Sequence, residues 1–521
     1  MIGNTMKEII YAIFLSFFLC GLCGNAEAKK KKEVKKAIKR EVQTPYDKLF
    51  KGKKAFTVNG LMKMHLMAGK VYAEFPIELL NRDLALTSSI EDISDNGEGV
   101  VGQFAGRVNQ FRFTLQDSML QARLVRRYGV KNTGMGKNAD QIIERSNTPG
   151  IFQSYKILAY TPDKKAVVVD MTELFLESSR LTNPFPSYAG NSLYGFVQRI
   201  HKFQSQRSEL LGICGNDNSM SVHCNLGFNV DRLVLGSFMQ AKDVPVSVTV
   251  NKILMLLPED PMRPRLADSR IGVNAIIQTE LPDVCQGIKT YYITKRWRIE
   301  PVDEIRYKQG EMVDVKKPIV FYIDTLMPDS WIKYVKAGAE AWNAAFEKIG
   351  LRNVVRTELF PKDSSFDAGD IHNSVIRYAP SWMYYPQYSM HTDPRTGEIL
   401  NASVYLPANV ASYFYTSRTE ETMAVDPSVR KARLSEEQFG EMFKAKMMQA
   451  IGRCLGLTDN YAASSVYPVD SLRSASFTRK YGVVASVMDD FTCNKIAQPE
   501  DVKKGVVLVQ QNLGPYDYEV I

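Results

Sequence analysis

In the first half of the chain, hydrophobic residues alternate with polar ones, which is typical of β-strands that bury one face. Phe111, Phe113 and Leu115 follow this two-residue period. Residues 155–171 read YKILAY, TPDKK and AVVVDM, which predicts a hairpin whose turn contains proline and aspartate. We therefore expect a β-rich region over residues 46–310.

In the second half, strand patterns and helix patterns follow one another. Residues 318–324 (PIVFYID) predict a short buried strand, and residues 332–349 carry hydrophobic residues at spacings of three and four, as one face of a helix requires. Gly350 is suited to end that helix because glycine accepts the left-handed conformation. Residues 374–379 (SVIRYA) and 399–407 (ILNASVYLP) predict two more strands, the second at an edge of the sheet.

A second long helix is predicted over residues 436–456. Ser435 and Gln438 have the spacing of a capping box, which fixes its start. Met448 and Ile451 lie on the face expected to pack on a sheet, and Gln449 lies one turn before Arg453 on the other side. The fold class predicted from both halves is α+β.

The N-terminus has the features of a secretory signal followed by a charged linker. Residues 1–28 combine Lys7, an apolar core and the small-x-small site Ala-Glu-Ala, which predicts a signal peptide. Residues 29–45 form a basic linker. No later stretch approaches the 18 apolar residues expected of a membrane span. We expect an exported protein, periplasmic or extracellular, with no transmembrane segment.

Charge gives no argument for a nucleic-acid partner. The formal net charge is +9, but residues 29–40 alone hold eight basic residues and one acidic residue. The remaining body, residues 41–521, carries 57 basic and 54 acidic residues and is close to neutral.

Histidines and cysteines limit the metal sites that the chain can build. There are five histidines, no two of them three or four residues apart, so an intact H-E-x-x-H motif is excluded. After the signal, five cysteines remain, an odd number. Cys214 and Cys224 are close enough in sequence for a local disulfide, and with His223 they form an alternative, weaker candidate for a metal site.

The helix that contains Gln449 and Arg453 resembles the active-site helix of metzincin-like zinc metalloproteases, whose pattern is H-E-x-x-H-x-x-G-x-x-H followed by a turn that contains methionine. Residues 449–459 align with that pattern, Gly456 matches its glycine, and Met488 matches the methionine of the turn. Stretches such as KRWRIEP, TDPRTGEILNAS and NYAASSVYPVDSLRS extend the resemblance to large exported bacterial zinc-dependent metalloproteases with N-terminal domains of uncharacterised function.

This resemblance implies a zincin-like domain over residues 311–521 that is shorter at its C-terminus than the family. It also identifies positions where the family's chemistry is missing. Gln449, Arg453 and Asp459 stand at the three zinc-ligand positions, and Ala450 stands at the general base. An arginine cannot coordinate a metal ion, and alanine cannot accept a proton from water. We therefore expect no bound zinc, no other cofactor and no catalytic residue at this site.

Three interpretations follow. The first is a pseudoprotease whose former substrate cleft binds a polypeptide, with residues 399–407 offering an edge for strand addition. In the second, which is structural, Arg453 takes the place of the metal charge and pairs with Asp459 or Asp489. The third keeps the chain an active metallopeptidase, or another enzyme, through a non-standard site. The oligomeric state stays undetermined.

For that third interpretation, the sequence offers few reactive groups. His372 and His391 flank the predicted strand 374–379, and Cys454 lies beside Arg453, whose charge favours a thiolate. A structural role for each of these side chains is the alternative.

Overall fold

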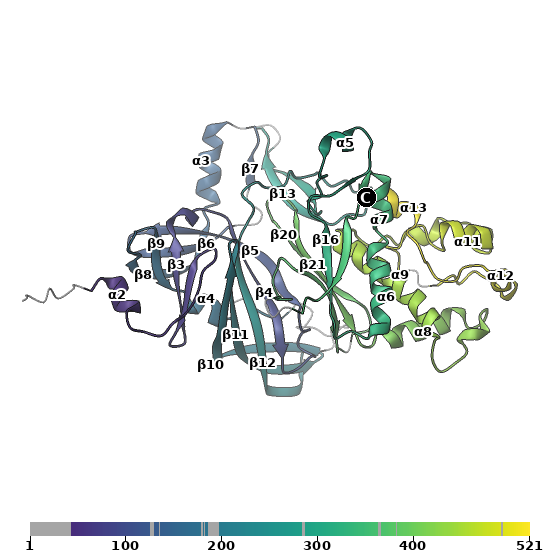
Figure 1. Cartoon of the computed structure of the whole chain (residues 1–521), viewed down its shortest axis with the longest axis horizontal. Helices are drawn as coiled ribbons and strands as arrows, with labels where there is room; N and C mark the ends of the chain where they lie inside the picture. Colours follow the sequence, from purple (N-terminus) through teal and green to yellow (C-terminus); the bar gives the residue numbers. More distant parts are fainter. Residues whose placement is uncertain are drawn as a thin grey trace, which may run out of the picture. The chain divides into compact units, whose positions relative to one another are not determined.

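A computed structural model describes residues 43–521 except 126–129, 135, 179–180, 182, 186–196, 284–286, 363–365, 382 and 491–492. The predicted signal peptide, most of the basic linker and Cys285 lie outside the described residues. Pro45–Ile521 form one compact unit. Its two halves have the predicted α+β character: long strands dominate the first, and helices with a smaller sheet dominate the second (Figure 1).

The first half is built on one antiparallel sheet of eleven strands. In spatial order these are β1 (Phe56–Val58), β2 (Lys63–Met67), β3 (Lys70–Pro76), β9 (Ala166–Asp170), β8 (Gly150–Tyr160), β6 (Met119–Leu124), β5 (Phe104–Gln116), β4 (Leu84–Ile93), β12 (Phe238–Leu256), β11 (Ser219–Val234) and β10 (Val197–Asn216). The two ends of the sheet approach each other, since the backbone N–H of Leu61 donates to the carbonyl of Asn216 over 2.7 Å.

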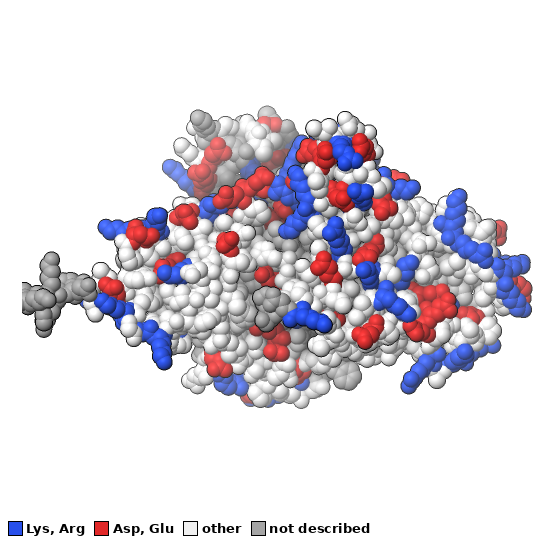
Figure 2. All heavy atoms as spheres, in the orientation of Figure 1, with Lys and Arg blue, Asp and Glu red and all other residues white. Residues whose placement is uncertain are grey.

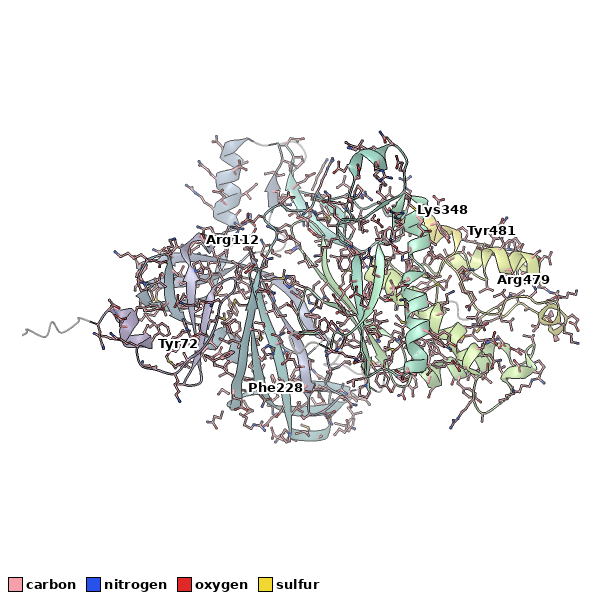
Figure 3. The ribbon with its side chains drawn as sticks, viewed as in Figure 1. Tyr72, Arg112, Phe228, Lys348, Arg479 and Tyr481 are labelled. Atoms are coloured by element: carbon pink, nitrogen blue, oxygen red, sulfur yellow. The ribbon has the colours of Figure 1, made fainter. Side chains whose placement is uncertain are left out.

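The alternating residues fill the core of this curled sheet, as predicted. Phe111 and Phe113 of β5 are buried, and Phe75 of β3 packs on Phe113 with ring centroids 4.8 Å apart. Further along the sheet, Phe228 of β11 (labelled in Figure 3) packs against Phe185 and Phe203. The predicted hairpin is confirmed as β8 and β9.

Cys214 and Cys224 do not form the local disulfide that their spacing in the sequence allows. Both are free thiols. Cys214 on β10 is aligned with Ser221 of β11, and Ser221 and Cys224 are three residues apart on one strand, so their side chains point to opposite faces of the sheet. Cys224 is buried, whereas Cys214 is exposed. Two cysteines on opposite faces cannot be bridged without moving the backbone.

The second half is built on a five-stranded sheet with helices packed against it. Its order is β18 (Val355–Leu359), β16 (Ile319–Ile323), β19 (Ser374–Ala379), β21 (Ile399–Pro407) and β20 (Gln387–Thr392). The first four strands are parallel and β20 is antiparallel to β21. The prediction of residues 399–407 as an edge strand is therefore wrong, because β20 lies outside β21 and forms the edge.

The predicted hydrophobic stripe over residues 332–349 forms two helices rather than one. α6 (Asp329–Glu340) and α7 (Asn343–Lys348) are separated at Ala341 and Trp342, although Trp342 stays buried in line with the stripe. Gly350 follows α7 with a φ of +82°, as its predicted role requires. The long predicted helix is α9 (Glu436–Cys454), and its capping box between Ser435 and Gln438 is present.

Smaller elements complete the part of the chain that the structure describes. The other helices are α2 (Pro45–Phe50), η1 (Ile77–Leu79), α3 (Lys137–Ser146), α4 (Thr172–Leu176), α5 (Glu304–Lys308), α8 (Val410–Thr422), η3 (Pro427–Val429), η4 (Ala463–Ser465), α10 (Val469–Leu472), α11 (Ala475–Tyr481), α12 (Pro499–Lys503) and α13 (Pro515–Val520). The other strands are β7 (Val130–Asn132), β13 (Ala275–Leu281), β14 (Lys289–Thr294), β15 (Val313–Asp314) and β17 (Leu351–Arg352). Among the described residues, no helix is both long and apolar enough to cross a membrane.

The molecular surface carries mixed charge. On the face shown in Figure 2, lysine and arginine side chains are interspersed with aspartate and glutamate. Exposed ion pairs on the protein surface include Arg306 with Glu311 and Arg352 with Asp314. Such pairs contribute little to stability individually.

Candidate functional site

Helix α9 and the turn after it hold the residues that the sequence marks as a degenerate metal site. Trp342 packs against the helix, and its indole N–H donates to the carbonyl of Met448 over 2.9 Å. Gly452 lets Met488 approach closely, because a Cβ on Gly452 would lie only 2.4 Å from the Met488 sulfur. Met488 itself is fully buried. The predicted methionine turn therefore lies directly against the helix.

The turn around Met488 is held by a buried carboxylate that the sequence prediction missed. Asp517 accepts hydrogen bonds from the Ser486 hydroxyl at 2.6 Å and from the backbone N–H groups of Val487 and Gly514 at 2.9 and 2.7 Å. Asp517 lies 29 residues after Met488, and no local sequence pattern connects the two.

Gly456 turns the chain back towards the helix. Its φ is +104°, and a Cβ there would lie 2.4 Å from the carbonyl oxygen of Lys295. Only glycine satisfies both conditions without displacing the backbone. Two residues later, the N–H of Thr458 donates to the carbonyl of Gly272 over 3.0 Å. This path brings Asp459 next to Arg453.

Arg453 and Asp459 form an ion pair at the mouth of the site. The Nε and Nη2 groups of Arg453 donate to Oδ1 of Asp459 at 2.9 and 2.7 Å. Tyr461 donates to Oδ2 of the same carboxylate at 3.3 Å, and the guanidinium lies 5.7 Å from the ring centroid of Tyr388 on β20. Of the two aspartates predicted as partners, Arg453 pairs with Asp459.

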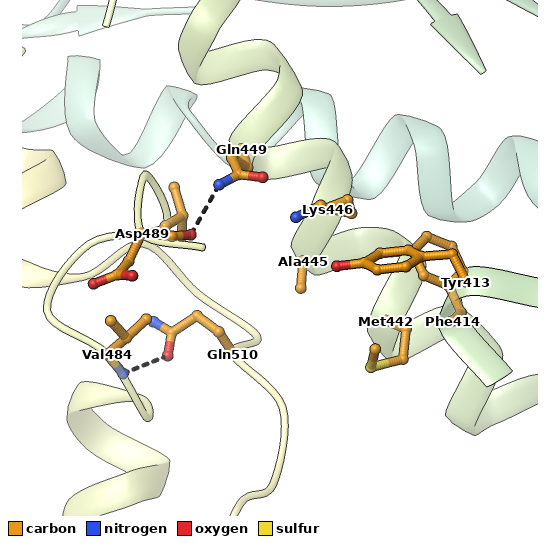
Figure 4. Close-up of a pocket in the computed structure, with 10 residues that line it drawn as sticks. Tyr413, Phe414, Met442, Ala445, Lys446, Gln449, Val484, Asp489 and Gln510 are labelled. Carbon is orange, nitrogen blue, oxygen red and sulfur yellow. Dashed lines mark hydrogen bonds between the residues drawn. The ribbon is translucent and has the colours of Figure 1, made fainter. Parts of the chain in front are cut away.

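Gln449 and Asp489 are connected through a different contact. The Gln449 side chain is buried, and its Nε2 group donates to the backbone carbonyl of Asp489 over 2.8 Å (Figure 4). The Asp489 carboxylate accepts from the N–H of Ser464 over 2.7 Å. The amide of Gln449 thus ties helix α9 to the methionine turn.

An open hollow of about 530 Å³ lies over these side chains. Its lining residues come from α9, from the segment that leads into β20, from the turn after Gly456 and from the methionine turn: Tyr385, Pro386, Lys446, Gln449, Ala450, Arg453, Tyr461 and Asp490. A second hollow of about 400 Å³ shares Lys446 and Gln449 and is otherwise more apolar, with Tyr413, Phe414 and Met442 on one side (Figure 4). The two hollows meet at α9.

Two segments of the chain match known protein families. The family described as a domain of unknown function (DUF5117) matches residues 102–302. The family described as Met-zincin matches residues 431–521, which contain α9, Gly456, Met488 and Asp517.

The C-terminal part of the chain is therefore a Met-zincin domain. Its N-terminal half carries the uncharacterised domain, as the sequence resemblance implied. No curated protein and no solved structure matched the chain.

The side chains at this Met-zincin site do not fit a zinc ion. Zinc is held by thiolate, imidazole or carboxylate groups, and a catalytic site needs three of them. Here Gln449 is a neutral amide already bound to a carbonyl, Arg453 is a cation, and Asp459 is occupied by that cation. Ala450 offers no base. Among the described residues, the only group of three or more histidine, cysteine or carboxylate side chains close enough to share an ion lies elsewhere.

The other reactive groups considered from the sequence do not assemble a second centre around the Met-zincin helix. Cys454 is fully buried, and that burial raises the pKa of its thiol despite the neighbouring Arg453, so the predicted thiolate is not favoured. His372 is partly exposed and contacts Asp370 over 2.7 Å. His391 is buried on β20, where burial lowers its pKa to about 4.

Proposed function

We propose that this Met-zincin no longer hydrolyses peptides with zinc and instead binds an extended polypeptide in the hollow beside β20. The observation that carries this proposal is the Arg453–Asp459 ion pair. It joins two of the positions that the family pattern assigns to zinc ligands, and it places a permanent positive charge where a metal cation would have to sit. The surrounding scaffold of α9, Gly456 and Met488 is retained.

The polypeptide would pair with the free edge of β20. This strand is the last of its sheet, so one row of its backbone groups has no partner strand among the described residues. Gln387, Tyr388, Ser389 and Met390 are all at least partly accessible. An accessible edge supports strand addition, in which backbone hydrogen bonds give affinity and neighbouring side chains give selectivity.

Aromatic side chains would supply much of the binding energy. Tyr388 is 41% exposed and Tyr461 is 67% exposed, and they flank the Arg453 guanidinium. Exposed tyrosines of this kind often dominate the free energy of association, because they bury a large area at a small entropic cost.

We further propose that the protein is exported before it acts. The support is the pattern of residues 1–28, with its basic start, apolar core and Ala-Glu-Ala site. The ligand would then be an extracytoplasmic polypeptide. N-terminal sequencing of protein secreted by its native cell tests this, and a mature chain that still starts at Met1 would contradict it.

The test of binding uses fluorescein-labelled β-casein as an unfolded polypeptide and reads its fluorescence anisotropy. We expect saturable binding that is at least about fivefold weaker for Tyr388→Ala and Tyr461→Ala, since truncating a contact tyrosine commonly costs more than 1 kcal/mol. Tyr160→Ala is the matched control, because Tyr160 is 48% exposed but lies on β8 of the other sheet and lines neither hollow, whereas Tyr461 lines the larger hollow and Tyr388 on β20 lies beside the Arg453 guanidinium. Equal affinity for all four proteins would exclude the hollow as the binding site. Zinc-dependent cleavage of the casein would instead support an active peptidase with a non-standard site.

A further inference from the structure

We propose that Glu91, His223 and Asp367 bind one divalent transition-metal ion of the Zn²⁺ or Mn²⁺ class. This site shares no residue with the hollow at α9 and does not depend on the function proposed for that hollow. One potential ligand atom from each of the three side chains lies within 4.8 Å of the other two. A nitrogen and two carboxylate oxygens form a donor set that suits these ions.

Two strands of the large sheet supply the first two groups. His223 is on β11 and Glu91 is on β4, and Nδ1 of His223 lies 2.7 Å from Oε1 of Glu91. Between them runs β12, where Asn251 is aligned with both His223 and Ser89. Glu91 is the extra residue of a β-bulge, because Ile90 and Asp92 are aligned with consecutive residues of β12. Bulges of this kind redirect a side chain, often near a functional site.

The third group comes from a loop that is fastened onto this face of the sheet. Asp367 accepts from the N–H of Gly369 over 2.7 Å and from Nδ2 of Asn251 over 2.8 Å. The Ser89 hydroxyl donates to the carbonyl of Gly369 over 3.1 Å, and Asn373 donates to the carbonyl of Asp367 over 2.7 Å. The Asp367 carboxylate is therefore held in position before any ion binds.

A buried oxygen without a hydrogen-bond partner lies next to the cluster. Asn251 is completely buried, and its Oδ1 atom has no partner among the residues that the structure describes. That oxygen is on the same amide group whose nitrogen binds Asp367, so it lies within reach of the cluster. A buried polar atom left unpaired is costly unless an unplaced ion or water satisfies it. Asn251 thus offers an oxygen to the ion or to a water molecule bound to it.

Charge and exposure both favour an ion here. Two carboxylates that share one small site repel each other unless a cation lies between them. The Glu91 and His223 side chains are 25% and 20% exposed, which leaves a route for the ion and room for water ligands. Cys224, once grouped with His223 as a candidate ligand, is buried on the other face of the sheet and is not part of this site.

The experiment measures metal binding by the full chain after EDTA treatment and removal of the chelator, with Zn²⁺ and Mn²⁺ titrated separately by isothermal calorimetry. We expect one ion per chain for at least one of the two metals, with affinity at least about 100-fold weaker in His223→Ala and in the near-isosteric Glu91→Gln, because each removes one of three protein ligands. His372→Ala is the matched control, since His372 also contacts a carboxylate but lies outside the cluster.

Two results would overturn the proposal. One is the absence of binding of either metal to the unmodified chain. The other is unchanged affinity in both His223→Ala and Glu91→Gln, which would place the ion elsewhere. Glu91→Gln preserves the shape of the side chain. A loss of metal affinity in this variant, with an unchanged circular dichroism spectrum, would therefore show that a ligand is missing and not that the protein is misfolded. Neither result bears on whether the hollow at α9 binds a polypeptide.

Discussion

Arg453 donates two hydrogen bonds to a single carboxylate oxygen of Asp459, and this contact joins the last turn of α9 to the segment that follows Gly456. Both side chains are partly exposed, at 21% and 31%. The pair therefore contributes only modestly to stability. Its main effect is to place the positive charge of Arg453 at the family's zinc position.

A double-mutant cycle measures this contact. We expect Arg453→Ala and Asp459→Ala each to lower the free energy of unfolding by about 1 kcal/mol, with a coupling energy of about 0.5–1 kcal/mol, since the pair is half-open to solvent. Urea denaturation of the two single variants and the double variant gives the values. A coupling energy near zero would mean that the two residues do not interact in solution.

Restoring the family's ligands should restore zinc binding. The variant Gln449→His, Ala450→Glu, Arg453→His and Asp459→His places imidazoles on one face of α9 and on the segment that Gly456 brings back to it. In a His223→Ala background, which removes the second metal site, we expect about one zinc ion per chain by atomic emission. The matched control is His223→Ala alone, for which we expect none. No gain of zinc would show that the scaffold no longer holds the ligand geometry.

Gly456 is expected to be intolerant of substitution. Gly456→Ala forces a φ of +104° on alanine and drives its Cβ into the carbonyl oxygen of Lys295. Gly236 is the matched control, because its φ is +70° and a Cβ there would meet open space. We expect Gly236→Ala to cost about 1 kcal/mol and Gly456→Ala at least about 2 kcal/mol more. If urea denaturation gave equal losses in the free energy of unfolding for the two variants, the backbone near Gly456 would have to adjust to the added Cβ without cost.

His391 should make the fold sensitive to acid. The imidazole ring is buried, with its centroid 4.6 Å from the ring centroid of Phe104. Neither ring nitrogen has a hydrogen-bond partner among the described residues. Burial lowers the pKa of His391 from 6.5 to about 4, so between these values the unfolded chain takes up a proton that the folded chain does not. Stability therefore falls as the pH decreases from 6.5 towards 4, by about 2 kcal/mol between pH 7 and pH 5.

His391→Phe removes this titration while keeping an aromatic ring against Phe104, and His391→Gln serves if the phenyl ring does not fit. We expect the loss of stability between pH 7 and pH 5, measured by urea denaturation, to be about 2 kcal/mol smaller in the variant than in the unmodified chain. Comparing the variant with the unmodified chain separates the contribution of His391 from that of carboxylates that titrate in the same pH range. Parallel profiles would contradict a lowered pKa.

The sequence predicts the elements whose signals are local. The capping box at Ser435 gives the correct start of α9, and the strand pattern of residues 374–379 gives both bounds of β19, because neighbouring residues alone determine these signals. The edge position of residues 399–407 was wrong because it depends on β20, whose sequence QYSMHT has only a weak hydrophobic pattern. The break between α6 and α7 was missed because the spacing of hydrophobic residues continues through it.

The same distinction applies to the sites. The alignment of residues 449–459 predicts which side chains share the face of α9, but the choice of Asp459 over Asp489 as the partner of Arg453 depends on the turn at Gly456. The sequence groups His223 with Cys214 and Cys224, whereas the structure places it beside Glu91. Glu91 is 132 residues away in sequence, and only the pairing of β4, β12 and β11 brings the two together.

A peptidase assay tests most directly whether the Met-zincin site has lost zinc catalysis, as we propose. The unmodified chain and His223→Ala are loaded with zinc and incubated with β-casein, with and without 1,10-phenanthroline, and cleavage is followed by mass spectrometry. We predict no chelator-sensitive cleavage by either protein, because Ala450 cannot act as a base and Arg453 cannot hold the metal. Cleavage that phenanthroline abolishes, that persists in His223→Ala and that Asp459→Ala removes would contradict the account.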